Sequence, residues 1–149
     1  MSHEERNTVS SILAGILVNI WVILKLQRMF EDGRLSGDDA IKIWAQGMLW
    51  VIPVGIGLVI AITILFNILY AIATNNQSPS FLVDERDQAI TGFGMKVTMV
   101  ITSIGVIGMM IALALGVTTL SALIGLWFSF AAGSMIGDLA KLARYRRGF

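Results

Sequence analysis

A short charged run divides the sequence into two halves: Asp84-Glu85-Arg86-Asp87-Gln88-Ala89-Ile90. On each side lies a long stretch without Asp, Glu, Lys or Arg, residues 43–83 before the run and residues 97–137 after it. A bilayer core of roughly 30 Å is crossed by about 20 helical residues, so the stretches are too long for one crossing each. The charged run therefore predicts a point where the chain surfaces from the membrane.

The composition is that of an integral membrane protein. Of the 149 residues, 56% are hydrophobic and only 14% are charged, and the mean hydropathy is +0.77. A formal net charge of +1 lacks the basic excess that nucleic-acid binding needs. The absence of cysteine excludes disulfides, thiolate metal sites and a cysteine nucleophile. We therefore expect the lipid bilayer as a partner and no nucleic acid.

The first half contains two hydrophobic segments joined by a short polar turn. The first segment covers about residues 8–30, and Gly33 is suited to the left-handed conformation that ends a helix. Ser36, with Asp39 three residues later, predicts the N-cap of the second segment. Pro53 lies inside that segment without an N–H to donate, which predicts a kink.

The second half must also fold back, because its charge-free stretch is twice the length of one crossing. The best position is Gly116-Val117-Thr118-Thr119, which leaves about 19 and 18 residues on its two sides. The predicted fold class is all-α, an integral membrane protein with four transmembrane helices arranged as two helical hairpins. One membrane domain covers 1–149, with hairpin one at about 8–73, a polar linker at 74–83 and hairpin two at about 84–145.

The basic residues predict the orientation. Seven lie on the side of the N-terminus, the linker and the C-terminal tail: Arg6, Arg86, Lys96, Lys141, Arg144, Arg146 and Arg147. The first connection holds four: Lys25, Arg28, Arg34 and Lys42. Because cytoplasmic loops carry the excess of Lys and Arg, we expect a multi-pass protein of the bacterial inner membrane with both termini cytoplasmic.

The last hydrophobic segment has a small residue at every fourth position: Ser121, Gly125, Ser129, Gly133 and Gly137. The segment before it has a matching set: Gly105, Gly108, Ala112 and Gly116. Small residues let two helix backbones approach closely, which is how helices associate in lipid. The pattern predicts helix packing, either within the chain or between copies of it.

The charged run reads first as a helix start, with Asp84 as the cap and Glu85 and Asp87 in the first turn. A short second connection also brings it near the basic tail. We expect a cytoplasmic charge cluster there: Asp84, Glu85, Arg86, Asp87, Asp138, Arg144, Arg146 and Arg147. In one interpretation the acidic run pairs with the arginines and Asp138 with Arg86 or Lys96. In the other, the tail binds anionic lipid.

A resemblance rests on the same residues. The run Asp84-Glu85-Arg86-Asp87 at the start of the third helix and the ending Tyr145-Arg146-Arg147-Gly148 resemble a family of small four-helix bacterial membrane proteins with no assigned activity. The resemblance implies the four-helix layout and no particular chemistry. Members of that family are similar in often lying near genes for helix-turn-helix regulators.

Little in the sequence predicts chemistry within the membrane. No Asp, Glu or His is placed at membrane depth, and His3 is the one histidine, so we expect no catalytic residue, no metal site and no cofactor. Asn19 and Asn67 are expected to hydrogen-bond a neighbouring helix. The sequence thus favours a non-catalytic accessory or scaffold subunit, acting as a homo-oligomer or with a larger membrane partner. A small oligomeric channel or transporter is the alternative.

Overall fold

The computed structural model describes residues 3–74 and 84–147, so the predicted linker beyond Thr74 lies outside the described residues. The chain forms the helices α1 (His3–Glu31), α2 (Ala40–Leu49), α3 (Val51–Thr74), α4 (Glu85–Ala114) and α5 (Thr119–Arg147). With α2 and α3 taken together, these make four long apolar helical segments that could each span a membrane. The predicted all-α fold is confirmed, and the chain is a multi-pass membrane protein.

The turns that follow α1 and α4 have the same backbone structure. Gly33 follows α1 with φ 68° and Gly116 follows α4 with φ 90°. In each turn the glycine N–H bonds back three residues, and the next N–H bonds back five, from Arg34 to Met29 and from Val117 to Ala112. These are Schellman motifs, which satisfy the last carbonyls of a helix with backbone donors alone. The predicted stop at Gly33 and the predicted fold-back at Gly116 are confirmed.

The second transmembrane segment is broken where proline predicts it. Its helix ends at Leu49 and resumes at Val51, because Pro53 has no N–H to give to the Leu49 carbonyl. The predicted N-cap is wrong. Asp39, not Ser36, occupies the cap position of α2, and its side chain makes no capping hydrogen bond.

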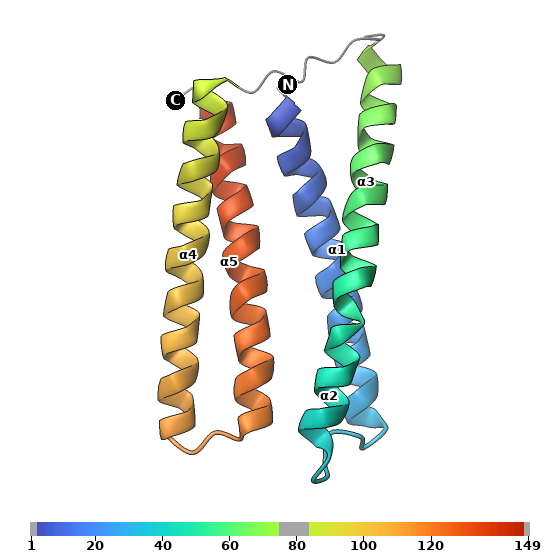
Figure 1. The fold of residues 1–149 in the computed structure, drawn as a ribbon, viewed down its shortest axis with the longest axis vertical. Coiled ribbons are helices and arrows are strands. Elements are labelled where there is room, and N and C mark those ends of the chain that lie inside the picture. Colours follow the sequence, from blue (N-terminus) through green and yellow to red (C-terminus); the bar gives the residue numbers. More distant parts are fainter. Residues whose placement is uncertain (1–2, 75–83, 148–149) are drawn as a thin grey trace.

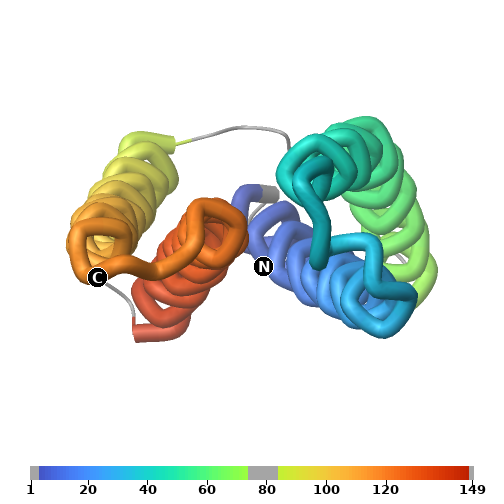
Figure 2. Tube along the Cα trace, turned by 90° about the horizontal axis from the view of Figure 1, so that it is seen from below, coloured from blue at the N-terminus to red at the C-terminus, as the bar shows by residue number. Residues whose placement is uncertain are grey.

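The helices lie in an open row rather than a closed bundle. Figures 1 and 2 show the order α4, α5, α1, α3, with α2 continuing the line of α3. The closest pairing is α4 with α5, and α1 joins the hairpins by packing on both α3 and α5. The starts of α1 and α4 and the ends of α3 and α5 share one end of the molecule (Figure 1). We call α1 to α3 hairpin one and α4 with α5 hairpin two.

The main apolar core lies toward the opposite end, around α1, α2 and the start of α5. Val22 is fully buried there, and Leu35 reaches in from the connection between α1 and α2 with 6% exposure. Partly buried side chains of α5, including Trp127 and Phe128, pack against this core. The two hairpins are therefore held together by large side chains at this end.

Candidate functional site

The contact between α4 and α5 is a seam of small residues. A Cβ added at Gly137 would lie 2.9 Å from the carbonyl oxygen of Gly94, and one added at Gly94 would lie 3.0 Å from the carbonyl oxygen of Gly137. One turn earlier on α5, a Cβ at Gly133 would collide with the Thr102 hydroxyl and approach the Thr98 carbonyl oxygen. The two backbones touch here, so no larger residue fits.

The seam uses part of the predicted set. On α5, Gly125 faces Met109 and Ser129 faces Gly105, in line with Gly133 and Gly137. Ser121 lies outside it, exposed in the first turn of α5 and hydrogen-bonded to Thr118.

Three positions predicted for the packing face of α4 and its C-terminal end lie outside the seam. A Cβ at Gly108 would meet nothing within 4 Å, Gly116 forms the turn, and Ala112 is half-buried near the end of the helix. The α4 residues that sequence reasoning missed are Gly94, Thr98 and Thr102. Their four-residue spacing was the available signal.

The charged run starts α4 as predicted. The Asp84 carboxylate accepts a hydrogen bond from the backbone N–H of Asp87 at 2.6 Å, which caps the helix. Glu85 and Arg86 are exposed. Asp87 is only 4% exposed, and its carboxylate accepts a hydrogen bond from the Tyr145 hydroxyl of α5 at 2.9 Å. A tyrosine therefore joins the acidic run to the C-terminal tail.

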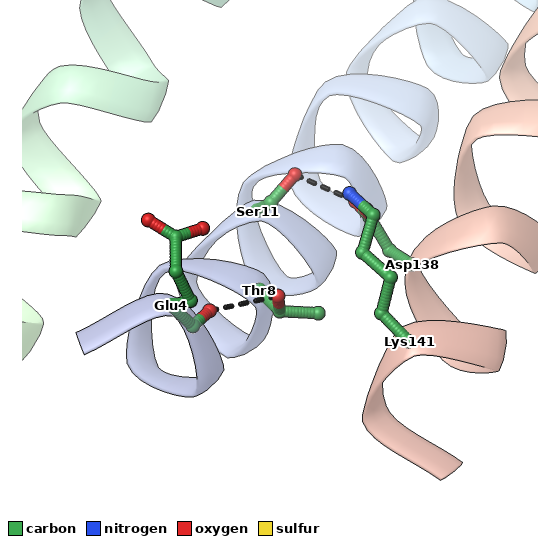
Figure 3. A network of polar contacts seen from close by, with 5 residues as sticks. All are labelled: Glu4, Thr8, Ser11, Asp138 and Lys141. Carbon is green, nitrogen blue, oxygen red and sulfur yellow. Dashed lines mark hydrogen bonds and ion pairs between the residues drawn. The ribbon is translucent and has the colours of Figure 1, made fainter. Parts of the chain in front are cut away.

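Asp138 links the two hairpins. Its carboxylate accepts from the Ser11 hydroxyl of α1 at 2.7 Å and from the Lys141 ammonium at 2.8 Å, and the residue is 8% exposed. Figure 3 shows Ser11 pointing from α1 toward Asp138 and Lys141 on α5. The predicted pairing of Asp138 with Arg86 or Lys96 is therefore wrong.

The tail arginines have separate environments. The Arg144 guanidinium stacks 3.6 Å from the centre of the Phe93 ring, a cation–π contact across the seam. Arg146 and Arg147 are exposed at the end of α5. We call the residues that join the helices here the polar end cluster: Ser11, Asp87, Asp138, Lys141 and Tyr145.

A pocket of about 290 Å³ adjoins this cluster between α1, α3 and α5. Its lining is mainly apolar, with polar groups from Ser11, Asn19, Ser134 and Asp138. Asn19 donates to the Gly15 carbonyl of its own helix at 2.8 Å, so the prediction of a bond to a neighbouring helix is wrong. Asn67 does the same with Thr63.

The residues described in the structure form no group of three or more His, Asp or Glu that could hold a metal ion. No family model, curated protein or solved structure matches this chain. The features of the described residues that bear on function are the seam, the polar end cluster, the pockets and the uncovered helix faces.

Proposed function

We propose that this chain is a non-catalytic accessory subunit that acts by packing its helices against another membrane helix, from a second copy or a larger partner. The open row of helices carries the proposal. At one edge, α4 packs against α5 and leaves large side chains such as Met99, Ile104 and Met110 more than half exposed. A row with a free edge offers a partner helix more contact area than a closed bundle does.

The edge also has room for close approach. Gly108 lies beside the seam and is half-buried, and a Cβ added there would have no atom of another helix within 4 Å. In lipid, helices associate through packing at small residues, because tails solvate apolar side chains as well as another helix does. A partner helix would approach α4 closely at Gly108, as α5 approaches α4 at Gly105.

The orientation belongs to the same proposal. We place the ends that carry the polar end cluster in the cytoplasm of a bacterial cell, with the protein in the inner membrane. The support is the seven-to-four distribution of basic residues and the shared end of the helix termini (Figure 1). Single cysteines at Ser2 and Gly33, labelled from outside intact cells, test it. Labelling at Gly33 alone is expected, and labelling at Ser2 alone would reverse the orientation.

The experiment for the proposed function compares Gly108→Phe with Gly57→Phe. Both positions are helical, and both have open space where a Cβ would lie, but Gly57 is on α3 at the other edge. After purification in mild detergent from the native membrane, we expect Gly108→Phe to lose the higher-mass assembly that wild type and Gly57→Phe retain. A monomeric wild type with no associated protein would contradict the proposal.

One observation favours transport as a second candidate. The pocket between the hairpins combines a mainly apolar lining with the Asp138 carboxylate, the combination of surfaces that small-molecule sites use. In reconstituted vesicles, a flux that wild type supports and Asp138→Asn abolishes would favour transport over the accessory role.

A further inference from the structure

A larger pocket lies at the opposite end of hairpin one, where the last turns of α1 meet α2. Its volume is about 560 Å³, within the range of about 300–1,000 Å³ typical of small-molecule sites. Three basic side chains line it, Lys25, Arg28 and Arg34, against the single carboxylate of Asp32. The pocket therefore has a positive excess, and neither the seam nor the polar end cluster involves it.

Lys25 is held in place within this pocket. Its ammonium donates to the Gly47 carbonyl of α2 at 2.7 Å and lies 5.1 Å from the centre of the Trp21 ring. An ammonium has three N–H donors, and one is used by Gly47. A fixed cation with donors to spare is suited to binding an anionic oxygen.

The two arginines are available for a ligand. In the part of the chain that the structure describes, neither Arg28 nor Arg34 makes an ion pair or a side-chain hydrogen bond. Arg28 follows Lys25 by three residues, so both lie on one face of α1. A guanidinium binds phosphate through two parallel N–H donors, which matches an arginine more closely to phosphate than to a monatomic anion.

Helix termination does not account for these charges. Basic residues at a helix C-terminus commonly stabilise its last carbonyls. Here the Schellman turn already satisfies carbonyls of Met29 and Phe30 with backbone N–H groups, and Arg34 lies beyond the end of the helix. Lys25, Arg28 and Arg34 also belong to the end of the molecule with four basic residues, against seven at the other end. The positive-inside rule therefore does not account for them either.

Two tryptophans form part of the wall of the pocket. Trp21 and Trp50 line it, and Trp50 is 68% exposed at the break between α2 and α3. Tryptophan rings favour the level of the lipid headgroups. Lys25 is also the first charged residue of α1 after its long uncharged portion, so the pocket lies where apolar and aqueous surroundings meet.

We propose that this pocket binds the phosphate group of an anionic ligand, with Lys25, Arg28 and Arg34 as its donors and the two tryptophans against its apolar part. Two sources have this chemistry, an anionic lipid headgroup and a soluble phosphate ester. The site is distinct from the α4 edge, so its failure would leave the proposed function open to its own test.

The experiment measures ligand occupancy on the full chain in neutral detergent by native mass spectrometry and thermal stability. The probes are phosphatidylglycerol, phosphatidylcholine, glycerol 3-phosphate and inorganic phosphate. Selective binding of phosphatidylglycerol supports the lipid source, and stabilisation by glycerol phosphate or inorganic phosphate alone supports the soluble source. Equal binding of phosphatidylcholine and phosphatidylglycerol, or no binding by any probe, overturns the proposal.

A matched variant separates the pocket from general surface charge. The double variant Arg28→Gln, Arg34→Gln should lower the affinity for the bound probe by about tenfold or more. Lys42→Gln removes an exposed charge from α2 outside the pocket and should leave the affinity within about twofold. Trp50→Ala alters a mostly exposed wall without touching the core, so it tests the same site if the double variant misfolds. Equal losses in the pocket variants and Lys42→Gln overturn the proposal.

Discussion

The two hairpins hold their helices together by different kinds of contact. Hairpin two packs α4 against α5 with almost no side-chain volume between them, at Gly94, Gly133 and Gly137. Hairpin one joins α1 to a broken second segment through large side chains around Val22 and through the Lys25 bond to Gly47. Added volume should therefore damage hairpin two, whereas lost volume should damage hairpin one.

The largest effect should come from bulk in the seam. Gly133→Leu would push a side chain into the Thr102 hydroxyl and the Thr98 carbonyl oxygen, and we expect it to lower the free energy of unfolding by about 3 kcal/mol. Ala132→Leu adds similar bulk at an exposed neighbour and should change it by less than about 0.5 kcal/mol. Chemical denaturation in detergent measures both. Equal stability of the two variants would mean that the seam is not tightly packed.

Hairpin one should respond to truncation instead. Val22 is fully buried and Ile23 is half exposed. Val22→Ala should lower the free energy of unfolding by about 2 kcal/mol because it leaves a cavity in the core, whereas Ile23→Ala should cost less than about 1 kcal/mol. The same denaturation measurement applies. A larger loss for Ile23→Ala would place the core on the other face of α1.

The join between the hairpins should be next in size. Ser11→Ala removes a hydrogen bond to the buried Asp138 carboxylate, and such bonds to charged groups contribute about 1.5 kcal/mol or more. Ser11→Ala and Asp138→Asn, measured singly and together, give the coupling energy of the pair. A coupling near zero would show that the hairpins do not depend on this contact.

The smallest loss of stability distinguishes the hydrogen bond seen in the structure from the ion pair that the sequence predicts in the charge cluster. Tyr145→Phe removes the hydroxyl that bonds the buried Asp87 carboxylate and should cost about 1.5 kcal/mol. Arg146→Glu changes an exposed charge and should cost less than about 0.5 kcal/mol. If Arg146→Glu is the more harmful change, and Asp87→Arg restores its loss, the ion pair predicted from sequence is the better description.

The breaks in the helices were predictable because they depend on local chemistry. Gly33 and Gly116 take positive φ values that other residues rarely adopt, and Pro53 lacks a donor wherever it is placed. The N-cap was not predictable, because Ser36 and Asp39 are both residue types favoured at such positions, and Asp39 takes the position without a capping hydrogen bond from its side chain.

The faces of the helices were only partly predictable. Gly108 follows Gly105 by three residues, which turns it about 60° away from the seam, although both belong to one stripe in the sequence. The bond from Ser11 to Asp138 depends on α1 and α5 being neighbours, which hydropathy does not determine. Residue spacing indicates that a helix has a packing face, and the arrangement of helices decides what that face contacts.

The most direct test of the proposed assembly uses the absence of cysteine in the chain. A single cysteine at Gly108, with one at Gly57 as the control, can be labelled with a maleimide that carries a photoreactive benzophenone, which inserts into C–H bonds of any neighbouring chain on irradiation in native membranes. We predict a cross-linked product from Gly108, at twice the mass of the chain if a second copy binds or at another discrete mass if a different subunit binds. We predict none from Gly57. Monomer alone from both positions would contradict the account, because the edge formed by α4 would then face only lipid.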